Sequence, residues 1–152
     1  MIAPVVALGF LLVSAGIEDA RIREIANWKN AAIALLAPLW WWSQGLEPWP
    51  GMAIQIGIAA IVLAIFVGAF ACGWMGGGDV KLIAALALWL PIKALLDMLM
   101  VMSIAGGAVT VAMMIDRTIR RRRTGAEPTP VEVPYGVAIA IAALLALPQT
   151  QF

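Results

Sequence analysis

The sequence predicts an all-α integral membrane protein, a polytopic bundle of about six transmembrane helices. Hydrophobic residues make up 63% of the 152 residues and charged residues only 12%, which leaves too little polar surface for a water-soluble globule of this size. Charged residues, prolines and glycines divide the chain into six apolar segments. The sequence has no second compositional block and no internal repeat, so residues 1–152 are expected to form one domain.

Each apolar segment is interpreted as one helix. In chain order they cover approximately residues 2–17, 28–42, 52–72, 80–90, 92–115 and 133–147. Several are shorter than the ~20 residues that span a bilayer, so tilted neighbours or helix ends that extend into the flanks are expected. Without a break at Pro91, residues 80–115 would form a helix about 54 Å long, too long to cross once. Two helices joined by a tight turn fit better.

The distribution of Lys and Arg predicts the orientation in the membrane. Only Lys93 of the ten cations lies in an even-numbered loop, and the other nine lie in the first, third and fifth loops: Arg21, Arg23, Lys29, Lys81, Arg117 and residues 120–123. The positive-inside rule makes the side with nine cations cytoplasmic. The N-terminus, the loop at residues 43–50 and the tryptophans around it are then expected outside.

Two polar motifs fall at this cytoplasmic surface, "EDARIREIAN" and "GGGD", with Asp19 and Asp79 60 residues apart in the sequence. A pair of closely placed carboxyl groups shares one proton, because their mutual repulsion raises one of the two pKa values. One acid can then act as a general base toward water while the protonated acid polarises a carbonyl, as peptide hydrolysis requires. Glycines 76–78 are expected to permit positive φ angles and close approach of a substrate backbone.

Other chemistry is disfavoured by the composition. The sequence has no His and only one cysteine, Cys72, so neither a metal site nor a cofactor is expected, and no histidine is present to activate the thiol. The remaining acids, including Glu18 and Glu24, are interpreted as ordinary charges at helix ends. The arginine run at residues 120–123 is interpreted as a topology determinant with some affinity for anionic lipid.

Three stretches together resemble the type IV prepilin peptidases, membrane aspartyl proteases of the GxGD type. The stretch "DARIREIAN" is similar to the first family motif through Asp19, Arg21, Ile25 and Asn27, and "GGGDVKL" is similar to the second through Gly76, Gly78, Asp79 and Lys81. The stretch "VPYGVAIA" is similar to the third through Pro134, Tyr135 and Gly136. Ala26 stands where the family usually has proline, a departure that loosens the start of the second helix without touching the acids.

The resemblance implies that Asp19 and Asp79 are the catalytic pair. It also implies the substrate, a prepilin or pseudopilin precursor cut on the cytoplasmic side between a short basic leader ending in glycine and the apolar helix that follows. Arg21 and Lys81 are expected to orient the acids or the substrate. The expected residues that shape the site are Asn27, Gly76, Gly78, Pro134, Tyr135 and Gly136.

Larger family members carry an extra cytoplasmic domain with paired CxxC motifs and N-methylate the trimmed pilin. With one cysteine, this chain resembles the short peptidase-only form associated with Flp pili of tight-adherence systems, with an archaeal preflagellin-type enzyme as the alternative. The resemblance implies a multi-pass protein of the bacterial inner membrane. The expected partners are the precursor and the bilayer, without nucleic acid.

Two other classes of function stay open at this point. One is a non-enzymatic membrane subunit of a pilus or secretion assembly, and the other is a small proton-coupled transporter. A transporter should place its acids near the bilayer midplane, whereas Asp19 and Asp79 fall near an interface. The peptidase hypothesis makes a geometric prediction. The first and fourth helices should border one cleft that both carboxyl groups enter, and a loop over residues 117–134 should cover this cleft.

Overall fold

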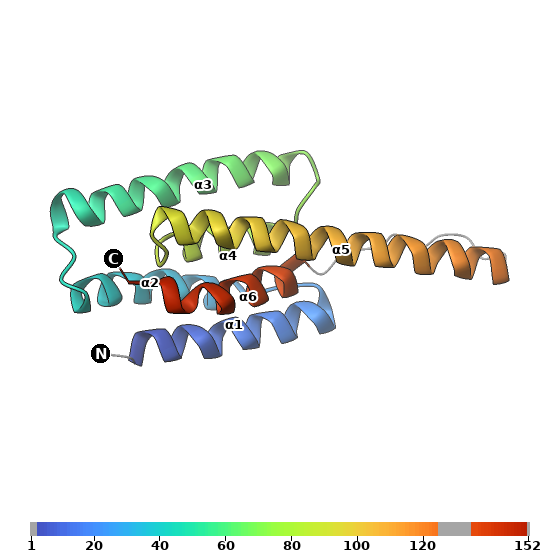
Figure 1. Ribbon diagram of the computed structural model, residues 1–152, viewed down its shortest axis with the longest axis horizontal. Coiled ribbons are helices and arrows are strands. Elements are labelled where there is room, and N and C mark those ends of the chain that lie inside the picture. The colour runs from blue at the N-terminus through green and yellow to red at the C-terminus, as the bar shows by residue number, and fades with distance from the viewer. Residues whose placement is uncertain (1–2, 125–134, 152) are drawn as a thin grey trace.

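A computed structural model describes residues 3–124 and 135–151, and this part of the chain is a bundle of six α-helices without strands (Figure 1). In chain order they are α1 (Ala3–Ile22), α2 (Asn27–Ser43), α3 (Ala53–Ala71), α4 (Gly77–Ala87), α5 (Ile92–Thr124) and α6 (Tyr135–Ala146). Short helical turns precede α3 (Pro48–Met52) and follow α6 (Leu147–Gln149). The predicted all-α fold class is confirmed.

Three of the helices are long and apolar enough to cross a membrane: α1, α3 with the turn before it, and the first part of α5. Their outward faces carry large apolar side chains, such as Phe10, Ile61 and Ile104, which are more than 60% exposed. Such surfaces are stable only against lipid or another protein. The other helices are shorter, and α4 has only 11 residues.

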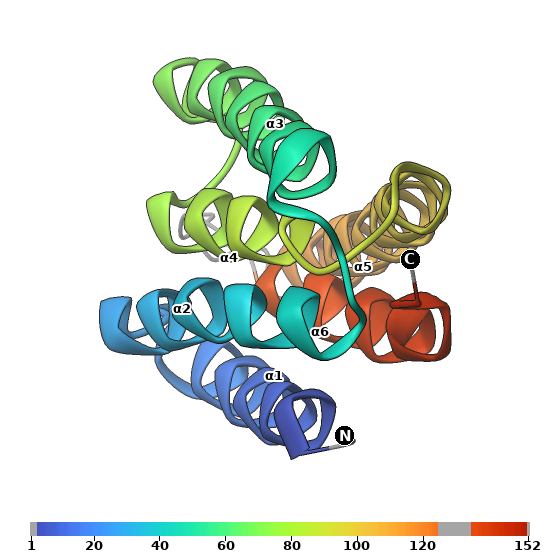
Figure 2. The same ribbon diagram turned by 90° about the vertical axis from the view of Figure 1, so that its left-hand side faces the viewer.

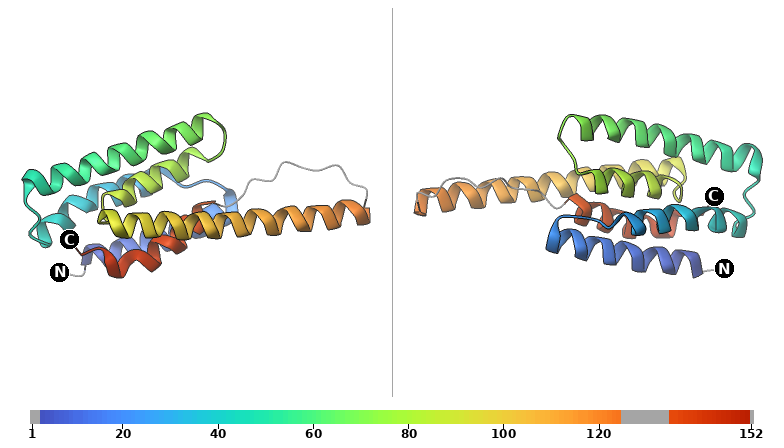
Figure 3. Two further views of the ribbon diagram at one scale, coloured as in Figure 1. Left: turned by 45° about the horizontal axis from the view of Figure 1, so that its top comes forward. Right: turned by 180° about the vertical axis from the view of Figure 1, so that it is seen from behind.

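The break at Pro91 divides α4 from α5, as the sequence predicts. Pro91 lies directly before α5, where its missing N–H removes no helical hydrogen bond, and its carbonyl accepts a hydrogen bond from the Leu95 N–H at 2.9 Å. At its other end α5 continues to Thr124 and extends well beyond the rest of the bundle (Figures 1 and 3). The prediction of a roofing loop is therefore wrong for residues 117–124, and residues 125–134 lie outside the described part of the chain.

Successive helices run in opposite directions along the bundle. The α1–α2 and α3–α4 connections lie at the same end as the last turns of α5, and both termini lie at the opposite end with the α2–α3 and α4–α5 connections (Figures 1 and 3). The end that holds the α1–α2 and α3–α4 connections is called the cation-rich end here, because the nine cations of the odd-numbered loops belong to it.

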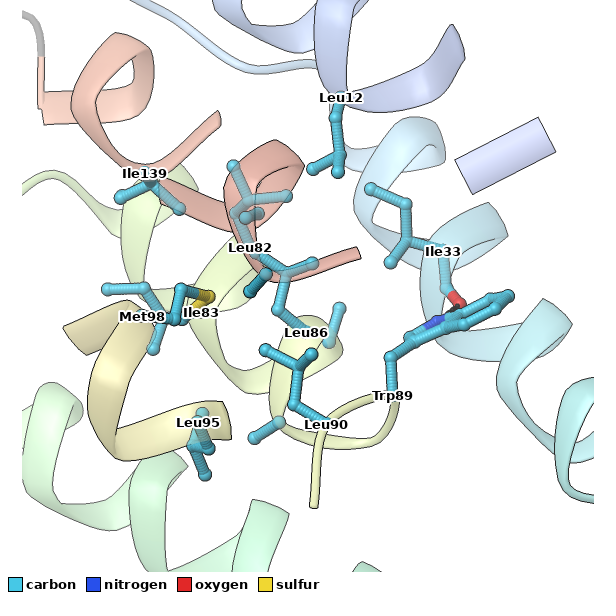
Figure 4. Close-up of a cluster of buried hydrophobic side chains, with 14 of the residues drawn as sticks. Leu12, Ile33, Leu82, Ile83, Leu86, Trp89, Leu90, Leu95, Met98 and Ile139 are labelled. Atoms are coloured by element: carbon cyan, nitrogen blue, oxygen red, sulfur yellow. Dashed lines mark hydrogen bonds between the residues drawn. The ribbon is translucent and has the colours of Figure 1, made fainter. Parts of the chain in front are cut away.

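The short helix α4 is the centre of the hydrophobic core. It lies between α3 on one side and α2 and α6 on the other (Figure 2), and its Leu82, Ile83 and Leu86 are fully buried. Figure 4 shows side chains of α1, α2, α5 and α6 converging on them, including Leu12, Ile33, Met98 and Ile139. Because α4 is packed on several sides, its first turn at the cation-rich end is held in place.

Candidate active site

Asp19 lies in the last part of α1, which continues past the apolar segment as far as Ile22. Its side chain is 5% exposed and points toward the start of α6, where the Val137 N–H donates a hydrogen bond to Oδ2 at 3.1 Å. A Cβ atom at Gly136 would lie 2.7 Å from the Asp19 Cγ, so this contact requires glycine. The N-terminal turn of α6, with its unpaired N–H groups, therefore holds the Asp19 carboxylate.

Asp79 lies in the first turn of α4, where a carboxylate is favoured by the helix dipole. Its side chain is 8% exposed. The chain reaches α4 through a turn at Gly73, whose φ of +72° is the left-handed conformation that suits glycine. The expectation of a positive φ at glycines 76–78 is wrong, because the reversal between α3 and α4 is made at Gly73 instead.

Glycines 76 and 78 allow close packing. A Cβ atom at Gly76 would lie 3.3 Å from Oδ2 of Asp79, and one at Gly78 would lie 3.4 Å from Cβ of Ile25. The backbone that approaches Gly78 is thus that of the α1–α2 loop. This packing brings the loop of the first motif against the helix of the second.

Asp19 and Asp79 line one pocket of about 680 Å³ at the cation-rich end of the bundle. The two connections α1–α2 and α3–α4 supply most of its wall, and Tyr135 at the start of α6 completes it. The other lining residues are Ile22, Arg23, Glu24, Ile25, Asn27, Gly73, Trp74, Met75, Gly76, Gly77 and Gly78. The two acids, distant in sequence, therefore share one concave site.

The environment of Asp79 favours its protonated form. Burial, and after it the negative charge of Asp19, raise the pKa of Asp79 to about 7, and a hydrogen bond from the Gly76 backbone opposes them. Desolvation and a like charge both penalise the ionised carboxylate. Two acids in one pocket with one proton between them can supply a general base and a general acid together.

The basic residue in the pocket is Arg23, whereas Arg21 and Lys81 do not line it. Arg21 and Lys81 each follow an aspartate by two positions, which on a helix turns a side chain to nearly the opposite face, whereas Arg23 follows Asp19 by four. Arg23 directly follows the last residue of α1 and has a φ of +60°. Helical spacing in the sequence would have identified Arg23.

A partly buried ion pair joins α1 to the start of α2, with Lys29 buried and Glu18 partly exposed. Lys29 Nζ lies 2.9 Å from Oε2 of Glu18 and donates to Ser14 Oγ at 2.7 Å, and the Ala26 N–H donates to the same Glu18 oxygen at 3.1 Å. From the sequence, Glu18 was interpreted as an ordinary charge, and Lys29 served only to predict the orientation in the membrane. The available signal was the position of Lys29 inside an apolar segment, where a cation needs a partner.

The other predicted site residues take different places. Asn27 lines the pocket, and its Oδ1 accepts a hydrogen bond from Lys81 Nζ at 2.7 Å. Tyr135 packs over Gly106 of α5, where a Cβ atom would lie 2.6 Å from the ring. Pro134 lies outside the described residues. Within residues 3–124 and 135–151, no group of three His, Cys, Asp or Glu side chains comes together as a metal-ligand set.

Comparison with known proteins identifies the family. The model of the type IV leader peptidase family matches residues 6–111, more than half of the chain, and the chain belongs to this family. The match contains both aspartates and ends before the third motif. Searches of the curated proteins and of the solved structures give no significant match. As an all-α membrane protein of this family, the chain is a peptidase of the prepilin type.

Proposed function

We propose that the protein is an aspartic endopeptidase that removes the short basic leader from prepilin or pseudopilin precursors at the cytoplasmic membrane face. The observation that carries the proposal is the shared pocket, which receives a buried carboxyl group from α1 and another from α4. Membership of the type IV leader peptidase family supports this class of substrate. The activity proposed for residues 1–152 is peptide hydrolysis alone.

In the proposed mechanism Asp79 is the protonated acid and Asp19 the ionised one. The raised pKa of Asp79 supports this assignment, as does the hydrogen bond that Asp19 accepts from the Val137 N–H. Asp19 removes a proton from a water molecule while the water oxygen bonds to the scissile carbonyl carbon. At the same time the proton of Asp79 passes to the carbonyl oxygen, so that a neutral tetrahedral gem-diol forms.

Collapse of this intermediate completes the reaction. The carbon–nitrogen bond breaks as the proton held by Asp19 passes to the leaving nitrogen, and one gem-diol hydroxyl returns its proton to Asp79. One water molecule is consumed, and both acids regain their starting protonation states. These steps need no group beyond the two carboxyls, the substrate and water.

The direct test uses purified protein in liposomes with a model precursor: a lysine-rich leader, a glycine, and an apolar helix of about 20 residues. We expect a shift of the precursor to the size of the trimmed product on a gel. Asp19→Asn and Asp79→Asn should each abolish the shift while inserting at normal levels. Substantial cleavage by either variant would remove the catalytic assignment.

The cytoplasmic location of the pocket is also part of the proposal, and it rests on the nine cations at that end of the bundle. The measurement is labelling of intact cells with an impermeant thiol reagent, in a Cys72→Ala background because Cys72 is exposed. A cysteine in place of Glu47 should react from outside, and one in place of Thr124 should react only after lysis. The reverse pattern would invert the orientation.

A further inference from the structure

A second concave surface lies beside the pocket, a groove of about 500 Å³ bordered by α2, α3 and α4. Figure 2 shows α4 between α2 and α3, and all three helices contribute residues to the lining. The residues that line the groove are Asn27, Asn30, Ala31, Ala34, Ile56, Ala59, Ala60, Leu63, Lys81, Ala84, Ala85 and Leu88. None of the described helices occupies it.

The groove has the surface that a helix needs for close approach. Six of its lining residues are alanines, two from each of the three helices. On α3 the lining residues lie at positions 56, 59, 60 and 63. On α4 they lie at 81, 84 and 85, and Leu88 follows directly after its last residue, so each helix presents one continuous face. In a membrane, small side chains on such faces allow another helix backbone to pack closely.

The groove is polar at the cation-rich end only. Lys81 and Asn27, joined by their hydrogen bond, stand at its rim, and Asn30 lies within its lining. Asn30 is 4% exposed and donates from Nδ2 to the Gly78 carbonyl at 3.2 Å. Its Oδ1 has no hydrogen-bond partner among the described residues. A buried acceptor without a donor is costly, and Asn30 lines the groove, so a ligand bound there with an N–H group would supply the missing partner.

The groove and the pocket meet at Asn27, which lines both. A ligand that fills both must therefore have an apolar part in the groove and a polar, extended part beside Asp19 and Asp79. A peptide whose extended segment leads into an apolar helix has this shape. The first turn of such a helix also carries unpaired backbone N–H groups, which are the donors that Asn30 Oδ1 lacks.

We propose that the groove between α2, α3 and α4 docks the first turns of the precursor's apolar helix, and so sets which peptide bond enters the pocket. The inference rests on the proposed function, because the occupant is the substrate of the same site. A phospholipid is the competing occupant, since its tails would match the alanines and its phosphate would match Lys81. It fits less well, because a phosphate offers no donor to Asn30 and a flexible tail does not require small residues.

The test is photo-crosslinking in liposomes that contain the model precursor. Benzoylphenylalanine replaces Ala60 or Ala31, which are exposed on opposite walls of the groove, and in the control it replaces Ile61, which is 63% exposed and does not line the groove. We expect adducts with the precursor from positions 60 and 31 and none from 61. Adducts with phospholipid alone, or equal adducts from position 61, would overturn the inference.

Cleavage measured in the same liposomes separates this inference from the proposed function. Cleavage without groove adducts would remove the docking surface and leave the peptidase assignment standing. Groove adducts without cleavage would keep the docking surface and remove the catalytic assignment. If neither occurs, both fail.

A second variant tests the groove without a crosslinker. Ala60→Trp fills the groove, so cleavage at subsaturating precursor should fall by roughly tenfold. Ile65→Trp, on the same helix but 64% exposed and outside the groove lining, should behave as the unmodified protein. Equal rates for Ala60→Trp and Ile65→Trp at low precursor would count against docking.

Discussion

The two ends of the helix bundle differ in how fully their buried polar groups are paired. At the end away from the pocket, each buried donor is matched by a carbonyl of the protein. Trp41 Nε1 donates to Leu88 O at 2.7 Å, Trp89 Nε1 to Ile33 O at 2.8 Å, and Gln55 Nε2 to two carbonyls at 2.7 Å. The stacked rings of Trp40 and Trp89 close this end.

At the cation-rich end Lys29 is paired with Glu18, but two other buried polar groups lie in unfavourable surroundings. Asp79 is buried beside the negative charge of Asp19, and Asn30 Oδ1 lacks a donor among the described residues. Such an arrangement lowers the stability of the free protein, and it is typical of sites where a ligand binds or a reaction takes place. The contrast separates an end that holds the fold together from an end that is arranged for chemistry.

Among substitutions that leave both carboxyl groups in place, the largest effect is expected from Gly136→Ala, which disturbs the pocket. The new Cβ would lie 2.7 Å from Cγ of Asp19, so the carboxyl group must move. A displacement of this size at a catalytic group costs on the order of 10²-fold in rate. Precursor cleavage in liposomes measures this loss of rate.

The matched control is Gly107→Ala, where nothing lies within 4 Å of the added Cβ, so activity should be unchanged. Equal losses in both variants would contradict the role of the contact between Gly136 and Asp19.

The pH dependence of cleavage should report the proton on Asp79. Because the protonated form is the general acid and its pKa is raised to about 7, activity should be retained below that pH and fall above it. The fall should approach about tenfold for each further pH unit. Initial rates between pH 5.5 and about 9 at saturating precursor provide the measurement. A rate that rises throughout this range would reverse the assignment of acid and base.

A smaller effect, confined to stability, is expected at the closed end. Gln55→Leu removes the donor shared by the Ala87 and Leu90 carbonyls, which lowers the free energy of unfolding by about 1–3 kcal/mol. Thermal unfolding in detergent measures this loss, and the cleavage rate well below the melting temperature should stay unchanged. The control is the same substitution at the exposed Gln44. A lost cleavage rate with normal stability would show that the ends are not separate.

Much of the fold could be predicted because it depends on local properties. Apolar segments gave the helices, and Pro91 gave the break between α4 and α5, since both follow from hydrophobicity and from the missing proline N–H. The end of α1 was placed too early because the charged residues after Ile17 ended the apolar segment but not the helix. Hydropathy reports contact with lipid, whereas helical hydrogen bonding continues to Ile22.

The pocket was predictable only in part. The two acid motifs and the alternation of helix direction place Asp19 and Asp79 at one end, and helical spacing could have selected Arg23 over Arg21. The contact of Gly136 with Asp19, the Glu18–Lys29 ion pair and the groove beside Lys81 depend on how helices distant in sequence pack together. No pattern along the chain specifies those distances.

The central claim is that Asp19 and Asp79 act as one catalytic unit, and the most direct measurement compares four proteins in the liposome assay. These are the unmodified protein, Asp19→Asn, Asp79→Asn and the double variant, each normalised to the amount inserted. Groups that act as a unit are strongly non-additive, so each single variant should lose roughly 10³-fold or more and the double variant no more than the worse single one. Losses that multiply in the double variant, or substantial cleavage by either single variant, would contradict the account.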